Sequence, residues 1–338
     1  MSRRPSLATS LLLLAVLAIA SASAVADTGT DEPGSIIIFP KIASSSSEET
    51  IIQLSNAAGT PAELRCFYVN GAPSEDSGPP VWSITDFQLK LTALQPTVWT
   101  AGVGLPAIPP DDRPPGLYPG PVPPVGDAFL GELRCIVVNA NESPVSRNVL
   151  TGEATIVDRA TGAVRKYQAT ALRGLPGNNG DNTLLLNDGE YTSCPRILLM
   201  NHFFEGAPDP VSGAPLQTTL TLVPCSVDFE GSTPGSASVQ FTVINELELR
   251  FSASIEVVCF ASVTLTQISR PVFDYAIQGT LVGQTRIRAI VDGDTLHGHA
   301  ILGVAEEFRT GTDGGAAMNL HFIGGNLQGD VVVLPGPF

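Results

Sequence analysis

Residues 63–70 read Glu63-Leu64-Arg65-Cys66-Phe67-Tyr68-Val69-Asn70, and the stretch returns as Glu132-Leu133-Arg134-Cys135-Ile136-Val137-Val138-Asn139. The two copies lie 69 positions apart and are identical at six of eight places, whereas the sequence around them does not repeat. Both alternating faces of the first copy are apolar, which is typical of a central strand covered on both sides. We therefore predict two neighbouring strands of one β-structure, which a disulfide between their cysteines can join.

Short runs rich in Ile, Val, Leu and aromatic residues recur along the whole chain and are separated by Gly and Pro turns. The turn cluster 56–61 predicts a hairpin between strands at 50–54 and 62–69, and a second hairpin is expected between 154–157 and 164–169. Helical signals are confined to one short turn at 196–204. The pattern predicts an all-β protein of two antiparallel, Ig-like β-sandwich domains stapled by disulfides.

The expected organisation has four parts. Residues 1–26 read as a signal peptide, residues 27–173 as the first sandwich, residues 174–183 as a Gly- and Asn-rich linker, and residues 184–338 as the second sandwich. The first part has two arginines, an apolar run of about ten residues and a small-residue cleavage site, which is the pattern of an export signal. The run is too short to span a membrane, so we expect a secreted, periplasmic or extracellular protein without stable membrane insertion.

Charge restricts the partners that this chain can have. The formal net charge is −15, from 33 acidic and 18 basic residues. A chain of this charge is expected to avoid nucleic acid and anionic membrane surfaces. The favoured interpretation of the acidity is solubility of an exported protein.

The five cysteines are Cys66, Cys135, Cys194, Cys225 and Cys259. An oxidising compartment favours disulfides, and two bridges with one free thiol can be arranged in many ways that the sequence does not distinguish. We expect Cys66–Cys135 and Cys225–Cys259, with Cys194 unpaired. One cysteine on an early strand and one on a late strand of each half is the arrangement that an inter-sheet bridge needs.

Residues 106–124 contain nine prolines in nineteen positions. Proline lacks the backbone donor of a central strand, so an extended, partly polyproline-II loop is expected between Trp99 and the second repeat. A partner docking on this loop and a stiff loop without a role are both open, and the second is favoured. Trp82, Trp99 and Tyr118 are candidates for a sugar-stacking platform, although packing in the core or in a loop is the favoured interpretation.

His297-Gly298-His299 places two imidazoles on one face of a predicted strand, with His321 on the next predicted strand and Glu306 between them. Three histidines and a carboxylate are a ligand set for Zn, Fe, Cu or Mn. The histidine pair resembles the first half of a cupin metal motif, although Glu306 lies further from His299 than that motif places its carboxylate. Solvent-facing histidines on an outer strand are the favoured interpretation.

Three loop clusters rich in oxygen ligands, 178–182, 187–190 and 292–294, are candidates for calcium binding. Their Asn-Gly and Asp-Gly pairs are also what tight turns require, and the turn interpretation is favoured. The chain has no G-x-S-x-G elbow, Walker loop or dinucleotide fingerprint. We therefore expect no resident cofactor, with calcium or a transition metal as the alternative.

Two stretches, 34–56 and 220–230, resemble uncharacterised exported bacterial proteins that are predicted to be β-rich. The resemblance implies a β-rich fold and no particular activity. The segment Thr50–Asn56 is also similar to the opening of bacterial cell-surface Ig-like modules, which is an analogy of fold.

The favoured function is that of a secreted, non-catalytic β-sandwich protein with a structural or binding role at the cell surface or in the extracellular matrix. Its expected partners are a surface or extracellular protein or a glycan. One alternative is a metal-dependent enzyme that uses His297, His299 and His321. The other alternative is a carbohydrate-binding module that uses the aromatic residues.

Overall fold

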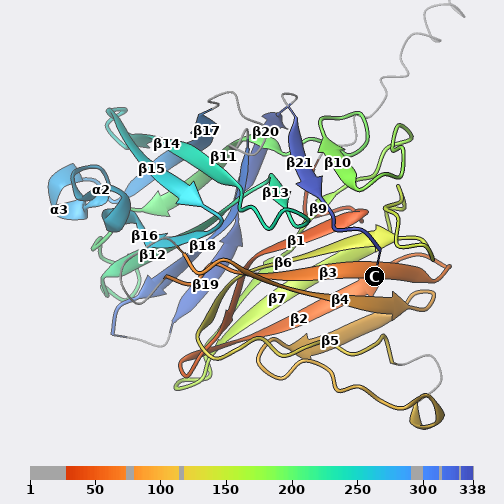
Figure 1. The fold of residues 1–338 in the computed structure, drawn as a ribbon. Helices are drawn as coiled ribbons and strands as arrows, with labels where there is room; N and C mark the ends of the chain where they lie inside the picture. The colour runs from red at the N-terminus through yellow and green to blue at the C-terminus, as the bar shows by residue number, and fades with distance from the viewer. Residues whose placement is uncertain are drawn as a thin grey trace, which may run out of the picture.

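The computed structural model describes residues 28–73, 80–113, 118–290, 300–311, 314–326 and 329–337. Over these residues the chain is nearly all β, with two short helices and several antiparallel sheets (Figure 1). The expected signal peptide lies outside the described residues, as do His297 and His299. Within the described part of the chain, no helix is both long enough and apolar enough to cross a membrane.

The described strands of the first half belong to one nine-stranded sheet of order β4-β3-β6-β1-β2-β7-β8, with β5 paired to β2 and β9 paired to β1. They are β1 (Ile36–Ser44), β2 (Glu48–Asn56), β3 (Ala62–Asn70), β4 (Ser83–Leu91), β5 (Pro96–Thr100), β6 (Phe129–Val138), β7 (Leu150–Asp158), β8 (Val164–Gln168) and β9 (Thr170–Leu172). A 3-10 turn, η1 (Pro110–Asp112), lies between β5 and β6.

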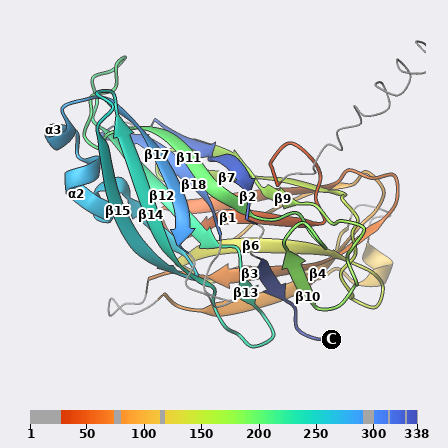
Figure 2. The same ribbon diagram turned by 90° about the horizontal axis from the view of Figure 1, so that it is seen from above.

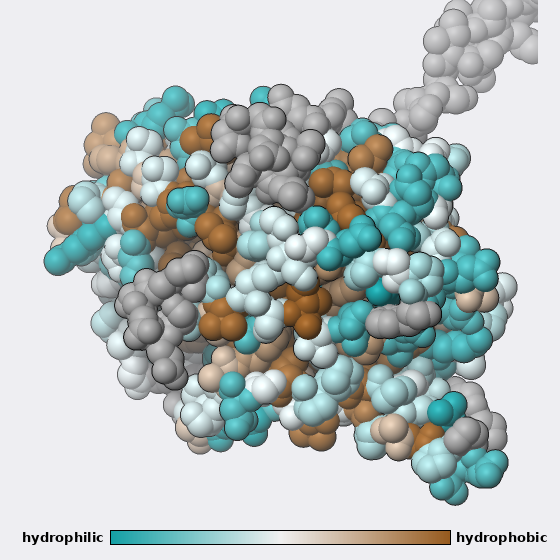
Figure 3. Space-filling view, viewed as in Figure 1, coloured by the Kyte–Doolittle hydropathy of each residue, from teal (hydrophilic) through white to brown (hydrophobic). Residues whose placement is uncertain are grey.

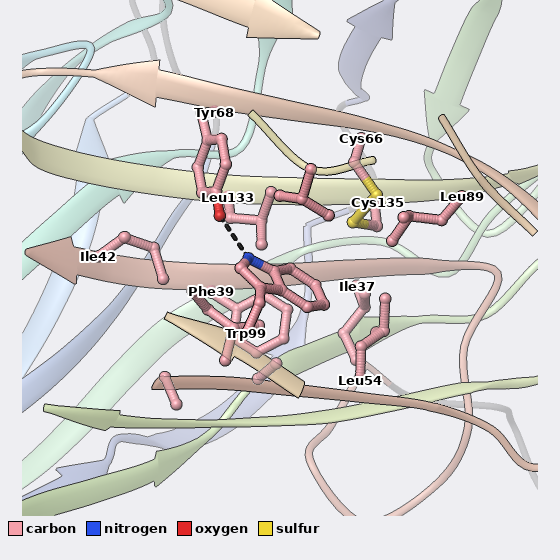
Figure 4. Close-up of a cluster of buried hydrophobic side chains, with 14 of the residues drawn as sticks. Ile37, Phe39, Ile42, Leu54, Cys66, Tyr68, Leu89, Trp99, Leu133 and Cys135 are labelled. Atoms are coloured by element: carbon pink, nitrogen blue, oxygen red, sulfur yellow. Dashed lines mark hydrogen bonds between the residues drawn. A yellow bond between two sulfur atoms is a disulfide. The ribbon is translucent and has the colours of Figure 1, made fainter. Parts of the chain in front are cut away.

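This sheet folds back on itself. The ladder between β1 and β2 has a single aligned pair, Ser44 with Glu49, whereas β2 pairs with β7 along its whole length. One layer is therefore β4-β3-β6-β1 and the other is β5-β2-β7-β8 (Figure 2). Buried side chains from both layers meet between them, with Cys66 and Leu133 from one layer against Leu54 and Trp99 from the other (Figure 4).

The described strands of the second half form three further sheets, of orders β10-β21-β13, β15-β14-β17-β11-β20 and β16-β12-β18-β19. They are β10 (Thr183–Leu186), β11 (Pro195–Phe203), β12 (Leu216–Pro224), β13 (Val227–Asp228), β14 (Ser236–Asn245), β15 (Arg250–Val258), β16 (Ala261–Thr264), β17 (Val282–Ile290), β18 (Ile301–Arg309), β19 (Gly315–Asn319), β20 (His321–Gly325) and β21 (Asp330–Val333). The five-stranded and four-stranded sheets enclose a core that includes Phe241, Ile287 and Ala305.

Two helices, α2 (Leu265–Phe273) and α3 (Tyr275–Gln278), follow β16. A capping box starts α2, in which the Gln267 side chain accepts a hydrogen bond from the Thr264 backbone N–H at 2.8 Å. The sequence pattern missed these helices because α2 is short, contains Pro271 and is interrupted at Ser269, whose φ of −166° is not helical.

The two halves share a core, although each described sheet is built within one half. Ile36, Phe67 and Ile136 on the outer face of the first-half layer pack in one cluster with residues of the second half such as Tyr191 and Leu302. Alternation explains this double burial, because successive side chains of a strand point to opposite faces. Strands β1, β3 and β6 are therefore covered on both sides.

Several local expectations need correction. The hairpin predicted through residues 56–61 is wrong, because β2 pairs with β5 and β7 whereas β3 pairs with β4 and β6. That turn carries the chain from one layer to the other. Residues 196–204, expected to form a helical turn, lie mostly in strand β11. The hairpin of β7 and β8 is confirmed, with Ala154 opposite Tyr167.

Candidate functional site

The repeated stretches lie side by side as β3 and β6, with Cys66 directly opposite Cys135. The predicted Cys66–Cys135 disulfide is confirmed, and the two Cα atoms are 4.1 Å apart. This separation is that of a non-hydrogen-bonded antiparallel pair, in which side chains approach most closely. The bridge therefore joins neighbouring strands of one layer, and the inter-sheet bridge expected for this half is wrong.

The predicted Cys225–Cys259 bridge is also wrong. Cys225 is joined to Cys194, with their Cα atoms 6.6 Å apart, and Cys259 is a buried free thiol. Burial, with a further contribution from the charge of Glu132, raises the pKa of the Cys259 thiol to about 12. The spacing of the cysteines carries no signal that selects Cys194 over Cys259 as the partner of Cys225.

The two arginines of the repeat bind the backbone of the second half. The guanidinium of Arg134 donates to Pro224 O at 2.6 Å and to Cys225 O at 2.7 Å. In the same way, Nη1 of Arg65 donates to Pro335 O at 2.7 Å and to Gly336 O at 3.1 Å, so the C-terminal residues lie over β3 (Figure 1). Each copy of the repeat thus clamps one segment of the other half.

Glu132 is the buried partner of Arg134. Its Oε1 accepts from Arg134 Nε at 2.9 Å, while its Oε2 has no hydrogen-bond partner. Burial raises the pKa of the Glu132 carboxyl, and the neighbouring guanidinium opposes that shift. Both side chains are buried, and Arg134 joins the halves through its bonds to Pro224 and Cys225, which is a structural role.

Glu306, a predicted metal ligand, belongs to a second ionic junction between the halves. It is fully buried, and its two carboxylate oxygens accept from Lys41 Nζ and from Arg165 Nε, the latter at 2.8 Å. Arg165 also pairs with Glu48, and the Tyr167 hydroxyl donates to the backbone oxygen of Lys41. Both oxygens of Glu306 are occupied by cations of the protein, and we therefore remove Glu306 from the metal hypothesis.

His321 lies apart from Glu306. It is exposed on β20, where it pairs with Leu199 of the five-stranded sheet, whereas Glu306 is on β18 of the four-stranded sheet. Within the described ranges, the only group of potential metal ligands close enough to share an ion is Cys194, Cys225 and Asp330. The disulfide removes both thiolates of that group, so it offers one carboxylate. The metal role of His297 and His299 stays a prediction outside the described residues.

The described oxygen-rich loops use their side chains in turns. Asn178, Asn179 and Asp181 each accept a hydrogen bond from a backbone N–H two residues further on, at 2.7–2.8 Å. Asn187 accepts in the same way from the N–H of Gly189 at 2.9 Å. These Asx turns agree with the favoured turn interpretation. The cluster at 292–294 lies outside the described residues.

The three aromatic candidates occupy different surroundings. Trp99 is 3% exposed and donates from Nε1 to the Tyr68 hydroxyl at 2.6 Å within the first-half core (Figure 4). A buried indole cannot stack on a sugar, so Trp99 is removed from the platform. Trp82 packs against the shared core and donates to Ser232 O at 2.9 Å, whereas Tyr118 lies in the Pro-rich loop.

Described residues of the Pro-rich loop form one wall of a groove of about 1230 Å³. The opposite wall is strand β4, and the ends of β3 and β6 close the third side. Tyr118 holds the loop in shape, because its hydroxyl donates to Pro106 O at 2.8 Å and its ring lies under the guanidinium of Arg113. Described residues of the loop contact the backbone of β4 at two neighbouring places. The Lys90 N–H donates to Pro119 O at 2.7 Å, and Gly120 lies against the Gln88 carbonyl, where an added Cβ would be 3.0 Å from its oxygen.

Strand β4 is an edge strand beside this groove, and the loop covers its outward backbone in part, at Lys90 and at the Gln88 carbonyl. Because Cys66 and Cys135 form a non-hydrogen-bonded pair, the polar backbone groups of Cys66 point away from β6 and toward Phe87 of β4. Those of Asp86 and Gln88 then point outward, on the same side as the Lys90 N–H. In the described residues, no backbone group pairs with Asp86 or Gln88 on this side.

Charged side chains are distributed around the groove in both signs. Glu63 pairs with Lys90 at 2.6 Å, and Gln88 Nε2 donates to Glu142 at 2.7 Å. Arg113 lies on the opposite wall. The core side chains Leu64 and Leu89 lie beneath the groove and are buried, so the polar backbone and side chains of β4 are what the groove exposes.

Apolar residues do not form another broad surface on the face seen in Figure 3, where they gather in small groups separated by hydrophilic residues. A smaller hollow of about 620 Å³ lies at the end of β11 and β17 and includes His202. The ring of His202 is buried, its Nε2 shares a hydrogen bond of 2.8 Å with the Thr285 hydroxyl, and burial lowers its pKa to about 4. A neutral, fully bonded imidazole of this kind is a core residue.

No protein-family model matches the chain, and no curated protein matches it. The resemblances stated on residues 34–56 and 220–230 stay predictions. Geometry alone therefore defines the chain as a β-protein with a groove beside the edge strand β4.

Proposed function

We propose that the chain is an exported, non-catalytic binding protein that takes an extended polypeptide segment into the groove between β4 and the Pro-rich loop. The observation that carries the proposal is the outward-facing backbone of Asp86 and the outward-facing N–H of Gln88, which pair with no described backbone group along a groove of about 1230 Å³. A polypeptide is the ligand whose donors and acceptors alternate with the period of a strand edge, and strand addition is a recurring mode of peptide recognition.

The surroundings of the groove favour binding over catalysis. Its charged groups are paired with each other or are turned to the rim, and none forms a nucleophile–base pair with a third orienting group. The two-layer packing of each half supports the interpretation as two Ig-like sandwich units, a scaffold that commonly presents binding edges and loops. Two disulfides fit an oxidising destination outside the cytoplasm.

Proline at position 88 tests the backbone contact. Because the Gln88 N–H faces the groove, Gln88→Pro removes a donor that β3 does not use, and proline is tolerated on edge strands in this orientation. Gln88→Ala is the matched control, since it removes the same side chain and keeps the N–H. The probe is a displayed library of ten-residue peptides selected on the wild-type protein, followed by titration of a selected peptide.

We expect the dissociation constant of the alanine variant for the selected peptide to lie within about threefold of the wild-type value. The proline variant should bind at least about tenfold more weakly, which is the loss expected when one edge hydrogen bond is removed and the proline ring obstructs the peptide. Circular dichroism and thermal melting verify that both variants are folded. Equal binding by the two variants, or failure of the library to yield any peptide, would overturn the proposal.

A further inference from the structure

The outer face of the five-stranded sheet carries a concentration of positive charge in an acidic protein. On β17, Thr285 and Ile287 are buried while Arg286 and Arg288 are exposed, as the alternation of a strand requires. Arg250 starts the edge strand β15 and is also exposed. Figure 1 shows β14, β15 and β17 together on one side of the molecule.

On the β14 side, the residues beside the two central arginines are uncharged hydrogen-bonding groups, whereas on the β11 side Arg286 is opposite Leu199. The ladder places Thr242 opposite Arg286 and Gln240 opposite Arg288 on β14, and then Ser252 and Ser254 on β15. We call Arg286, Arg288, Gln240, Thr242, Ser252 and Ser254 the arginine face. The guanidinium of Arg288 donates twice to the side-chain oxygen of Gln240, at 2.9 and 2.7 Å, which fixes its plane against the sheet.

Carboxylates are scarce on this face. Within the described part of the chain, no acidic side chain pairs with Arg286 or Arg288, and β14, β15 and β17 contain one carboxylate, that of Glu256 opposite Ser238 at the far end of β15. Glu246 follows β14 at the other end, where its carboxylate accepts from the Leu281 and Val282 N–H groups. The protein as a whole has 33 acidic and 18 basic residues. Two arginines without counter-ions are therefore the exception on this surface, and they favour a ligand with negative charges of its own.

We propose that the arginine face binds an acidic polysaccharide, with carboxylate or sulfate groups paired to Arg286 and Arg288 and sugar hydroxyls bonded to the amide and hydroxyl side chains beside them. Guanidinium groups match planar anions by paired hydrogen bonds. The adjoining Gln, Thr and Ser side chains can each donate and accept, which is what a sugar hydroxyl requires.

The geometry favours a glycan over other polyanions. Strands of nine or ten residues make a flat surface about 30 Å long, which suits an extended chain. Proteins that bind nucleic acid or anionic membranes do so through clusters of many Lys and Arg side chains. Two arginines do not outweigh the net charge of −15 of this chain, which repels such large polyanions. The site is remote in sequence and in sheet from the β4 groove, so the inference stands independently of the peptide-binding proposal.

Titration with defined oligosaccharides tests the proposal. The probes are a galacturonate hexamer and a heparin-derived hexamer, which separate carboxylate from sulfate recognition, with cellohexaose as the neutral control. The variant is Arg286→Gln with Arg288→Gln, and the matched control is Lys166→Gln with Arg270→Gln, which changes the net charge equally at exposed cations elsewhere. Single-stranded DNA and vesicles of anionic phospholipid are titrated in parallel.

We expect at least one acidic hexamer to bind, its affinity to fall as salt is raised, and the face variant to bind about tenfold more weakly, since two exposed charge contacts each contribute modestly. The control variant should stay within about twofold of wild type. Equal binding of the neutral hexamer, an equal loss in both variants, or tighter binding of DNA or vesicles than of either hexamer would overturn the proposal.

Discussion

Replacing Arg134 with methionine tests whether the arginines of the repeat hold the two halves together. The guanidinium is 1% exposed and makes three hydrogen bonds, to Pro224 O, to Cys225 O and to Glu132 Oε1. Methionine keeps much of the apolar stem and removes all three bonds. Two carbonyls and one carboxylate then stay buried without their partner, which makes this substitution costly.

The magnitude follows from the buried ion pair. Removing one partner of such a pair destabilises a protein by about 3–5 kcal/mol, and we expect about 4 kcal/mol here because the carbonyls also lose a donor. The double variant Arg134→Met with Glu132→Leu should recover a large part of the loss, since apolar replacement of a whole buried pair is often neutral. Urea unfolding of the disulfide-intact protein measures the free energy of each variant.

The pH dependence provides a second readout. Burial already raises the pKa of Glu132 above its ordinary value of 4.5, and loss of the arginine raises it further. A carboxyl whose pKa is higher in the folded state supports folding fully at low pH and loses that contribution as pH rises through the folded-state pKa. The deficit of Arg134→Met should thus be larger at pH 8 than at pH 4.5. A deficit below about 1 kcal/mol, or a double variant no more stable than the single one, refutes the reasoning.

Two further predictions concern buried titratable groups. Burial lowers the pKa of His202 from 6.5 to about 4, so the unfolded state binds the proton more tightly than the folded state. The free energy of unfolding should therefore fall by up to about 3 kcal/mol as the pH is lowered from 6.5 to 4. Unfolding curves of His202→Gln should lose that part of the pH dependence, whereas those of the exposed His321→Gln should retain it. Cys259 is 3% exposed, and burial raises the pKa of its thiol to about 12. A thiol reagent at pH 8 should therefore label Cys259 more than about a hundredfold faster in denaturant than in the folded protein. Equal labelling rates would contradict its burial.

The parts of the fold that the sequence predicts are those with a local or repeated signal. The repeat predicts that β3 and β6 are neighbours, and their Cys66–Cys135 bridge follows from it. Proline content likewise predicts that no central strand forms at 106–124, because a missing donor excludes it. The described residues 106–113 and 118–124 agree, although Pro110–Asp112 form a 3-10 turn rather than an extended segment.

The remaining errors have physical causes. The residues at 56–61 predict that the chain changes direction. The same turn residues occur when two strands form a hairpin and when the chain passes from one layer to the other, as it does here between β2 and β3. The arginines at 65 and 134 read as ordinary polar positions in strands, since their carbonyl partners at 335–336 and 224–225 are far away in the sequence. Hydrogen-bond partners that lie so far apart in the sequence produce no periodic pattern. The arginine contacts between the halves and the groove beside β4 are therefore recognised only in the three-dimensional structure.

The contact of Arg65 with residues 335 and 336 has a consequence for biosynthesis. These carbonyls leave the ribosome 270 residues after Arg65 does. The outer surface of β1, β3 and β6, with Ile36 and Phe67, is covered by residues that are synthesised in stages, from Leu172 and Tyr191 to Leu302 and Leu334. Chains whose native pairings are so distant fold slowly and expose aggregation-prone surface meanwhile. We therefore expect the cover of this surface to be completed only when the C-terminal residues are present, and a truncation before residue 335 to be less soluble than the full chain.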